Sequence, residues 1–166
     1  MTSTELQPKL DPIGQRNHRI AVWTGQLFIL GVLVGWGLMG GFLLPPPAPG
    51  LSGEEVVAFL VDGGVRLRVG LCFALFGVGG LIPMSAVLAD QMRRMEGGRP
   101  IWANTQLVCA GLAMWLLSQM LIFFAVAAFR PDRDPALVQL IFDSAWLTLV
   151  APVAMVVLWQ AAVGAA

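Results

Sequence analysis

Long apolar stretches alternate with short polar segments along this chain. Three stretches contain no charged residue: Ile20–Leu44 with 25 residues, Val69–Ala89 with 21 and Leu107–Phe129 with 23. A fourth, Ala136–Ala166, contains a single charge, Asp143. A helix of about 20 apolar residues can cross the hydrocarbon core of a bilayer. The pattern therefore predicts four transmembrane helices, at about residues 20–44, 66–90, 104–129 and 137–164.

The composition agrees with this interpretation. Apolar residues make up 57% of the 166 residues and charged residues only 12%, whereas soluble domains carry about 25% charged residues. The mean hydropathy is +0.77. We therefore interpret the chain as an all-α membrane protein, with residues 20–166 forming one bundle in the lipid bilayer. Residues 1–19 are polar and contain two prolines, which predicts a flexible tail.

A short extra helix is predicted between the first and second spans. The segment "PPPAPG" ends the first span, because proline cannot continue a helix. Ser52 followed by Glu55 has the spacing of a capping box, and the Gly63–Gly64 pair is a natural stop. The intervening helix, about Ser52–Asp62, is too short to cross a bilayer. We expect it to lie at the membrane surface.

Basic residues in the connections predict the orientation of the spans. Short cytoplasmic loops carry an excess of Lys and Arg. The tail and the second connection carry six basic residues: Lys9, Arg16, Arg19, Arg93, Arg94 and Arg99. The first and third connections carry four: Arg66, Arg68, Arg130 and Arg133. This excess favours a bacterial cytoplasmic (inner) membrane protein with both termini inside and the short helix on the outer face.

Glycines in the first span suggest close helix packing. Gly31 and Gly35, and likewise Gly37 and Gly41, have the small-xxx-small spacing that lets two helix backbones approach in lipid. The partner is either another helix of the same bundle, which we favour, or a second copy of the chain.

The second span is predicted to contain a weak point. Gly79, Gly80 and Pro83 lie close together within it. Proline removes a backbone hydrogen bond to the preceding turn, and glycine lowers helix stability. We expect a kink there, either as a matter of shape or as part of a gate.

Asp143 is the one charged side chain inside an apolar stretch. If the fourth span begins at Leu137, Asp143 lies about 9 Å beyond its start. If the span is 144–164, Asp143 lies at the outer membrane boundary. A carboxylate costs about 2.5–3.5 kcal/mol at the bilayer centre and less at the edge, which favours the second position.

The orientation places Asp143 on the same side as three arginines, Arg66, Arg68 and Arg130. One hypothesis is an ion pair that pins the fourth span to the second. The other is an outward-facing polar cavity for transport, because ionisable groups inside membranes are often functional. We favour the ion pair. Gln119, deep in the third span, and Asn104, at its start, are further intramembrane polar candidates.

Few other chemical groups are present. No HExxH, GxSxG, P-loop or CxxC motif occurs, so no catalytic residue, metal site or cofactor is predicted. A net charge of zero gives no reason to expect nucleic-acid binding. We therefore expect an accessory or structural membrane subunit that binds another membrane protein or forms a homo-oligomer. The alternative is a small transporter or ligand-binding membrane protein with an outward-facing polar site around Asp143 and Arg68.

Three segments carry a resemblance: "GEEVVAFLVDGGVRLRVG", "MRRMEGGRPIWANTQL" and "AFRPDRDPALVQLIFDSAWLTLV". Through them, Ile20 to Val163 resembles a loosely defined group of bacterial multi-spanning membrane proteins with no established activity. The resemblance implies an architecture and no catalytic residue. Members of the group look longer, with further spans. The end of this chain, "LWQAAVGAA", lacks a polar flank, and we expect it to be the N-terminal part of a longer protein.

Overall fold

The computed structural model describes residues 12–48, 50–151 and 153–165, which are helical over most of their length and contain no strand. The helices are α1 (Pro12–Leu30), η1 (Gly31–Met39), α2 (Gly53–Gly79), α3 (Leu81–Glu96), α4 (Ile101–Phe129), α5 (Pro135–Val150) and α6 (Val153–Ala165). They combine into four helical stretches that are long and apolar enough to cross a membrane: Pro12–Met39, Gly53–Glu96, Ile101–Phe129 and Pro135–Ala165. The prediction of an all-α chain with four such helices is confirmed.

The first span starts and ends earlier than its apolar stretch. Helix α1 already begins at Pro12, so residues 12–19 of the predicted tail are helical. Residues 1–11 lie outside the described part of the chain. At Gly31 the α-helix gives way to the π-helix η1, which ends at Met39, five residues before Leu44. The chain then turns away at Gly41, whose φ of +73° suits a residue without a side chain.

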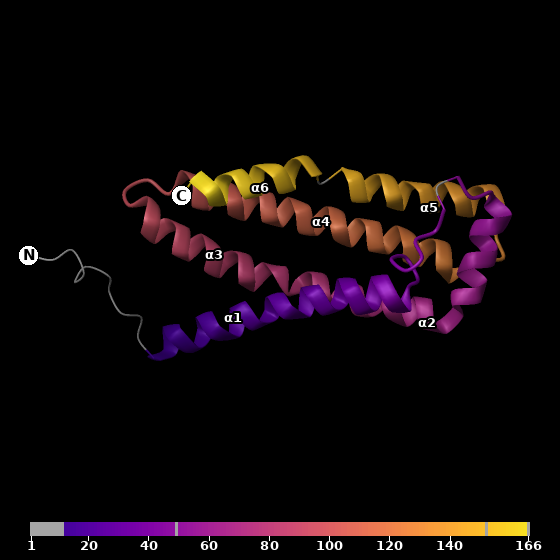
Figure 1. Ribbon diagram of the computed structural model, residues 1–166, viewed down its shortest axis with the longest axis horizontal. Helices are drawn as coiled ribbons and strands as arrows, with labels where there is room; N and C mark the ends of the chain where they lie inside the picture. Colours follow the sequence, from indigo (N-terminus) through magenta and orange to yellow (C-terminus); the bar gives the residue numbers. More distant parts are fainter. Residues whose placement is uncertain (1–11, 49, 152, 166) are drawn as a thin grey trace, which may run out of the picture.

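The predicted short helix is the first part of α2. Gly64, with φ 47° and ψ −130°, breaks the helix there, and the preceding residues cross the end of the bundle (Figure 1). The predicted capping box is present at its start. Ser52 N–H donates to Glu55 Oε2 over 2.7 Å, and Glu55 N–H donates to Ser52 Oγ over 3.3 Å.

Two further interruptions divide the second and fourth spans. The second span breaks at Gly80, between α2 and α3, where the sequence predicts a weak point. The fourth span, predicted as one helix, consists of α5, which ends at Val150, and α6, which begins at Val153, and residue 152 between them lies outside the described part of the chain. Asp134 caps α5 by accepting a hydrogen bond from Ala136 N–H over 2.8 Å.

The spans pack mainly on their neighbours in the chain. Helix α1 contacts α2 and α3, η1 contacts α2, and α4 lies between α2–α3 and α5–α6. Helix α5 also contacts α2. The start of α1, the end of α6 and the α3–α4 connection lie at one end of the bundle (Figure 1). The Pro-rich loop (residues 45–50) and the α4–α5 connection lie at the other.

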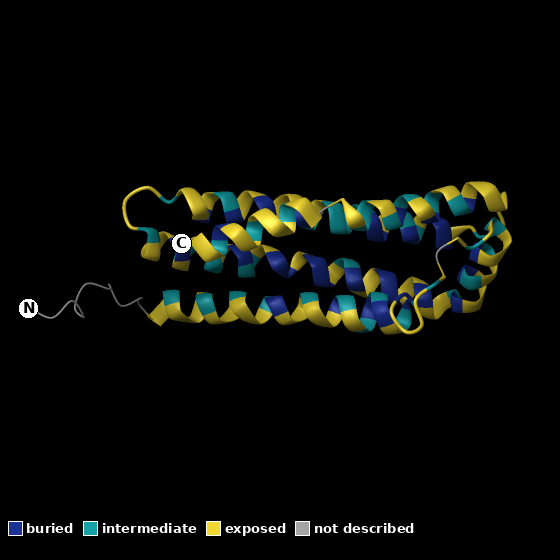
Figure 2. Ribbon diagram, turned by 45° about the horizontal axis from the view of Figure 1, so that its top comes forward, coloured by how far each residue is buried: buried dark blue, intermediate teal, exposed yellow. Residues whose placement is uncertain are grey.

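An aromatic cluster forms the core near the Pro-rich loop. Its centre is Phe42, which is 1% exposed. The Phe42 ring lies 4.3 Å from that of Phe124 and 5.6 Å from that of Trp36, between ring centroids. Phe59, Phe142 and Trp146 complete the cluster. Buried residues gather in this half of the bundle, whereas α1 is mostly exposed (Figure 2).

Candidate functional site

The structure does not bring Asp143 together with the predicted arginines. Asp143 is exposed on α5, and no ion pair between described residues includes it. Arg68 instead donates from Nε to the backbone oxygen of Ala128 over 3.0 Å. Arg130 holds its guanidinium carbon 5.9 Å from the centroid of the Phe129 ring. The predicted ion pair between the fourth and second spans is therefore absent from this structure.

The contact of Arg68 has a local physical cause. Ala128 lies in the last turn of α4, where backbone carbonyls lack partners within the helix and the helix dipole is negative. A guanidinium there satisfies an otherwise unpaired oxygen and joins α2 to α4. Arg66, two residues earlier, is exposed and lines a hollow with the Pro-rich loop and Glu55. The two arginines thus have separate surroundings.

Asp143 lies instead on the wall of an apolar groove. The groove has a volume of about 570 Å³ and separates α5 from the Pro-rich loop and the start of α2. Asp143 is the only ionisable side chain among the described residues that line it: Pro46, Pro47, Ala48, Gly50, Leu51, Val56, Phe142, Asp143, Trp146 and Leu147. The site therefore combines one carboxylate with hydrophobic and aromatic walls.

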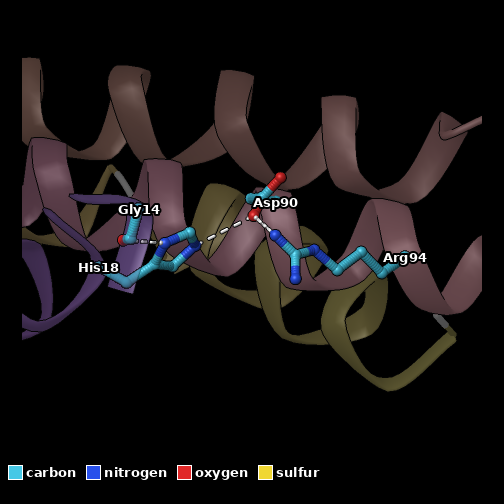
Figure 3. A network of polar contacts seen from close by, with 4 residues as sticks. All are labelled: Gly14, His18, Asp90 and Arg94. Carbon is cyan, nitrogen blue, oxygen red and sulfur yellow. Dashed lines mark hydrogen bonds and ion pairs between the residues drawn. The ribbon is translucent and has the colours of Figure 1, made fainter. Parts of the chain in front are cut away.

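At the opposite end of the bundle, a polar network joins the first span to the second (Figure 3). Asp90 on α3 accepts a hydrogen bond from Arg94 Nη2 over 2.7 Å. The same Oδ2 atom lies 3.0 Å from Nε2 of His18 on α1. The other ring nitrogen of His18, Nδ1, lies 3.0 Å from the backbone oxygen of Gly14. A carboxylate and a carbonyl both accept, so the doubly protonated imidazolium satisfies both contacts.

Further polar contacts hold the α3–α4 connection. Arg93 Nη2 donates to Oδ1 of Asn104 over 3.1 Å. Asn104, which the sequence suggested as an intramembrane polar residue, lies near the start of α4 and thus has an exposed arginine as its partner. Glu96 accepts the backbone N–H groups of Trp102 and Ala103 over 2.9 and 2.7 Å. The carboxylate therefore satisfies donors that the first turn of α4 would leave unpaired.

The predicted Gly31/Gly35 pair lies against α2. A Cβ atom on Gly31 would lie 2.8 Å from Cα of Gly77, and one on Gly35 would lie 2.6 Å from the backbone oxygen of Gly70. These contacts leave no room for a side chain between the two backbones. The second predicted pair has other surroundings: Gly37 faces Leu43, which follows in the same chain, and Gly41 makes the turn described above.

The burial of two polar side chains is apparent only in the structure. Ser85 on α3 and Gln106 on α4 are 0% exposed, and neither has a side-chain hydrogen bond to a described residue. An unpaired buried polar group costs about 1–3 kcal/mol. The sequence shows both residues in or beside apolar stretches, but the face of the helix that each occupies depends on the packing of α3 and α4.

Glutamines that face away from the core form a second group. Gln26 is exposed in the apolar part of α1, and Gln119 is half-buried in α4. Neither amide makes a hydrogen bond with a described residue. Gln26 lies near the middle of the 28-residue helix Pro12–Met39. A lone amide in an uncharged stretch is a signal that sequence reasoning had available but did not single out.

The outward direction of Gln26 follows from its neighbours. Thr24 Oγ1 donates to the backbone oxygen of Gly80 over 2.9 Å. A Cβ atom on Gly25 would collide with the Met84 side chain, which shows that this residue faces α3. Gln26 is the next residue along the helix, so its side chain points in a different direction from those of Thr24 and Gly25, and it is exposed.

No protein-family model, curated protein or solved structure matches this chain. Across the described residues, no group of three or more His, Cys, Asp or Glu side chains is arranged to hold a metal ion. The candidate sites are therefore the Asp143 groove, the His18–Asp90–Arg94 network and the exposed amide of Gln26.

Proposed function

We propose that this protein is a membrane-embedded accessory subunit that binds a transmembrane helix of another protein along the outward face of α1. The observation that carries the proposal is the exposed amide of Gln26, seven residues beyond Arg19 in the uncharged part of the first span. The proposed role is structural and involves no catalysis.

The physical argument rests on the cost of an unpaired amide in lipid. Hydrocarbon offers no hydrogen-bond partner, so a polar group at that depth is stabilised when it bonds to a neighbouring helix. Polar residues inside membranes accordingly face other helices or cavities rather than lipid. In this chain the faces of α1 that contact α2 and α3 are already occupied, and Gln26 points away from both.

The surroundings of Gln26 suit a helix as the partner. Arg19 lies two turns before Gln26. The exposed side chains one turn away on the same face, and the one two turns further along, are apolar: Val22, Trp23, Ile29, Leu30 and Leu33. A second helix lying along this strip needs a polar side chain, an amide or a hydroxyl, only at the level of Gln26. The glycines with dimer-motif spacing, Gly31 and Gly35, contact α2, so a close-packed homodimer through them is disfavoured.

We further propose the placement of the bundle in a bacterial cytoplasmic membrane, with the start of α1 inside. Support comes from the excess of basic residues near α1 and the α3–α4 connection, which lie at one end of the bundle. The part of α2 before Gly64 then lies at the outer membrane surface. The break at Gly64, which turns this segment across the bundle end, supports that position.

The proposal predicts that Gln26→Leu weakens partner binding without disturbing the fold, because leucine is apolar and favours a helix. An interhelical hydrogen bond contributes about 0.6–2 kcal/mol, so the partner should bind about 3- to 30-fold more weakly. The measurement is photo-crosslinking from a reactive residue at Leu30 in native membranes, followed by quantitation of the crosslinked partner in mild detergent.

The matched control is Gln160→Leu, which removes an exposed amide from α6 in the fourth span. It should leave the crosslinked yield unchanged. A product with the mass of two copies of this chain would assign the face to self-association and contradict the accessory role. Equal yields from Gln26→Leu and the unmodified protein would also contradict it.

A further inference from the structure

The groove beside Asp143 has the size and lining of a ligand site. Pockets for small molecules typically measure about 300–1,000 Å³ and have mostly apolar walls with a few polar groups. This groove measures about 570 Å³. Its walls come from two separate segments, the loop and helix start at residues 46–48 and 50–56 and the α5 face at residues 142–147.

The charge of the groove is of one sign. Asp143 has no ion-pair or hydrogen-bond partner among the described residues, and no basic side chain lines the groove. On α5, Phe142 is the residue before Asp143, and Trp146 lies one turn after it. The faces of aromatic rings attract cations, and the Trp ring attracts them most strongly. The carboxylate and the rings therefore favour a positive charge, while the proline, leucine and valine walls favour an apolar body.

The position of the groove in the bundle allows a charged ligand. Irregular backbone exposed to lipid does not occur inside the hydrocarbon core. The described loop residues 46–48, 50 and 51 are irregular, so their level corresponds to the membrane boundary, and Asp143 lies beside them. A ligand there can hold its charge at the boundary and its apolar groups in the groove.

We propose that the groove between the Pro-rich loop and α5 binds a small lipophilic monovalent cation, with the Asp143 carboxylate opposite the positive charge. This inference goes beyond the accessory role, since it concerns α5 and the loop, and α1 contributes no residue to the groove. Either proposal can fail while the other stands.

The test uses two ions of the same shape and opposite charge, tetraphenylphosphonium and tetraphenylborate. Their binding to the purified full chain is measured by calorimetry in nanodiscs of phosphatidylglycerol, with empty nanodiscs subtracted. The phosphonium should bind the unmodified protein, and Asp143→Asn should weaken this binding about tenfold or more, because the electrostatic attraction between the carboxylate and the cation is lost. The borate should bind no better to the unmodified protein than to Asp143→Asn.

Two further variants separate the site from general effects. Asp62→Asn removes an exposed carboxylate outside the groove and should leave phosphonium binding unchanged. Leu147→Trp keeps Asp143 but fills part of the groove, and should also weaken binding. Equal phosphonium affinity in Asp143→Asn and the unmodified protein overturns the proposal.

The lipid itself supplies the remaining alternative. The ammonium headgroup of phosphatidylethanolamine has the same charge as the proposed ligand. If nanodiscs containing this lipid weaken phosphonium binding tenfold in the unmodified protein but not in Asp143→Asn, the headgroup is the occupant and the assignment to a free cation is wrong. Unchanged affinity in both lipids supports the free cation.

Discussion

The guanidinium of Arg68 and the carboxylate of Asp143 show how far a residue's role depends on its neighbours. Both side chains are charged, and sequence reasoning paired them because they fall on the same side of the membrane. In the structure Arg68 bonds to the carbonyl of Ala128 at the end of α4, and Asp143 lines a groove without a basic partner. Arg68 therefore joins α2 to α4, whereas Asp143 has no ion-pair partner among the described residues.

This arrangement predicts different costs for removing the two charges. Arg68→Leu leaves the Ala128 carbonyl unpaired and should lower the free energy of unfolding by about 1 kcal/mol. Asp143→Asn breaks no contact between described residues, so its effect should stay within about 0.5 kcal/mol. The measurement is unfolding of the purified protein in mixed detergent micelles with increasing dodecyl sulfate.

Arg66→Leu serves as the control for Arg68→Leu, because Arg66 is exposed and makes no hydrogen bond to a described residue. It should leave stability unchanged. If Asp143→Asn destabilises the protein as strongly as Arg68→Leu does, the carboxylate pins the helices after all, and the separation of roles is wrong.

At the scale of helices, the contact between the first and second spans is made by backbone against backbone. Gly31 meets Gly77, and Gly35 meets Gly70, on facing turns. Close approach of this kind brings dispersion contacts that bulkier residues would prevent. The π-helix η1 covers the same stretch of the first span, so the change of helix type coincides with the closest contact.

The contact predicts that a single added methyl group at Gly77 is costly. A Cβ there would lie 2.7 Å from the backbone oxygen of Leu27 and 2.8 Å from Cα of Gly31, so the backbones must separate. Gly77→Ala should lower the free energy of unfolding by about 1–3 kcal/mol. Thermal unfolding in detergent, monitored by circular dichroism, measures the effect.

Gly79→Ala is the matched control, because nothing lies within 4 Å of a Cβ at this position in the same helix. Alanine favours the helix over glycine by up to about 1 kcal/mol, so this variant should be neutral or more stable. Equal losses at both positions would show that helix flexibility, rather than contact with the first span, determines the result.

The elements themselves were largely predictable. The four apolar stretches, the capping box at Ser52 and the break near Gly80 all follow from residues close together in sequence. The boundaries were less accurate, because hydropathy marks where lipid ends, whereas a helix continues until its backbone loses hydrogen bonds. Helix α1 therefore extends through polar residues back to Pro12, and α3 extends beyond residue 90, the predicted end of the second span, to Glu96.

For the whole molecule, an even number of spans places the start of α1 and the end of α6 at the same end of the bundle (Figure 1). The proposed orientation predicts that a reporter active only outside the cytoplasm works when fused after Gly50 or Asp132 and is silent after Gly97. The physical reason is the retention of the basic α3–α4 connection inside. A second reporter, active only in the cytoplasm, should show the reverse pattern at all three positions.

Activity of the external reporter after Gly97 would show that the bundle has the opposite orientation in the membrane. The His18–Asp90–Arg94 network would then lie outside, and the Asp143 groove would open toward the cytoplasm. The contacts within the bundle would be unchanged, since no described contact depends on orientation.

The amino-acid sequence alone determined the class of protein, the number of long apolar helices and most points at which they break. These properties depend on local composition and on the thickness of a bilayer, and both can be read along one chain. The tertiary structure decided which face each helix turns outward. In the structure Gln26 faces away from the bundle, and Arg68 bonds to a backbone carbonyl. Asp143 lies beside a loop that precedes it by nearly a hundred residues in the sequence. Such outcomes depend on contacts between distant segments, which hydropathy and spacing do not encode.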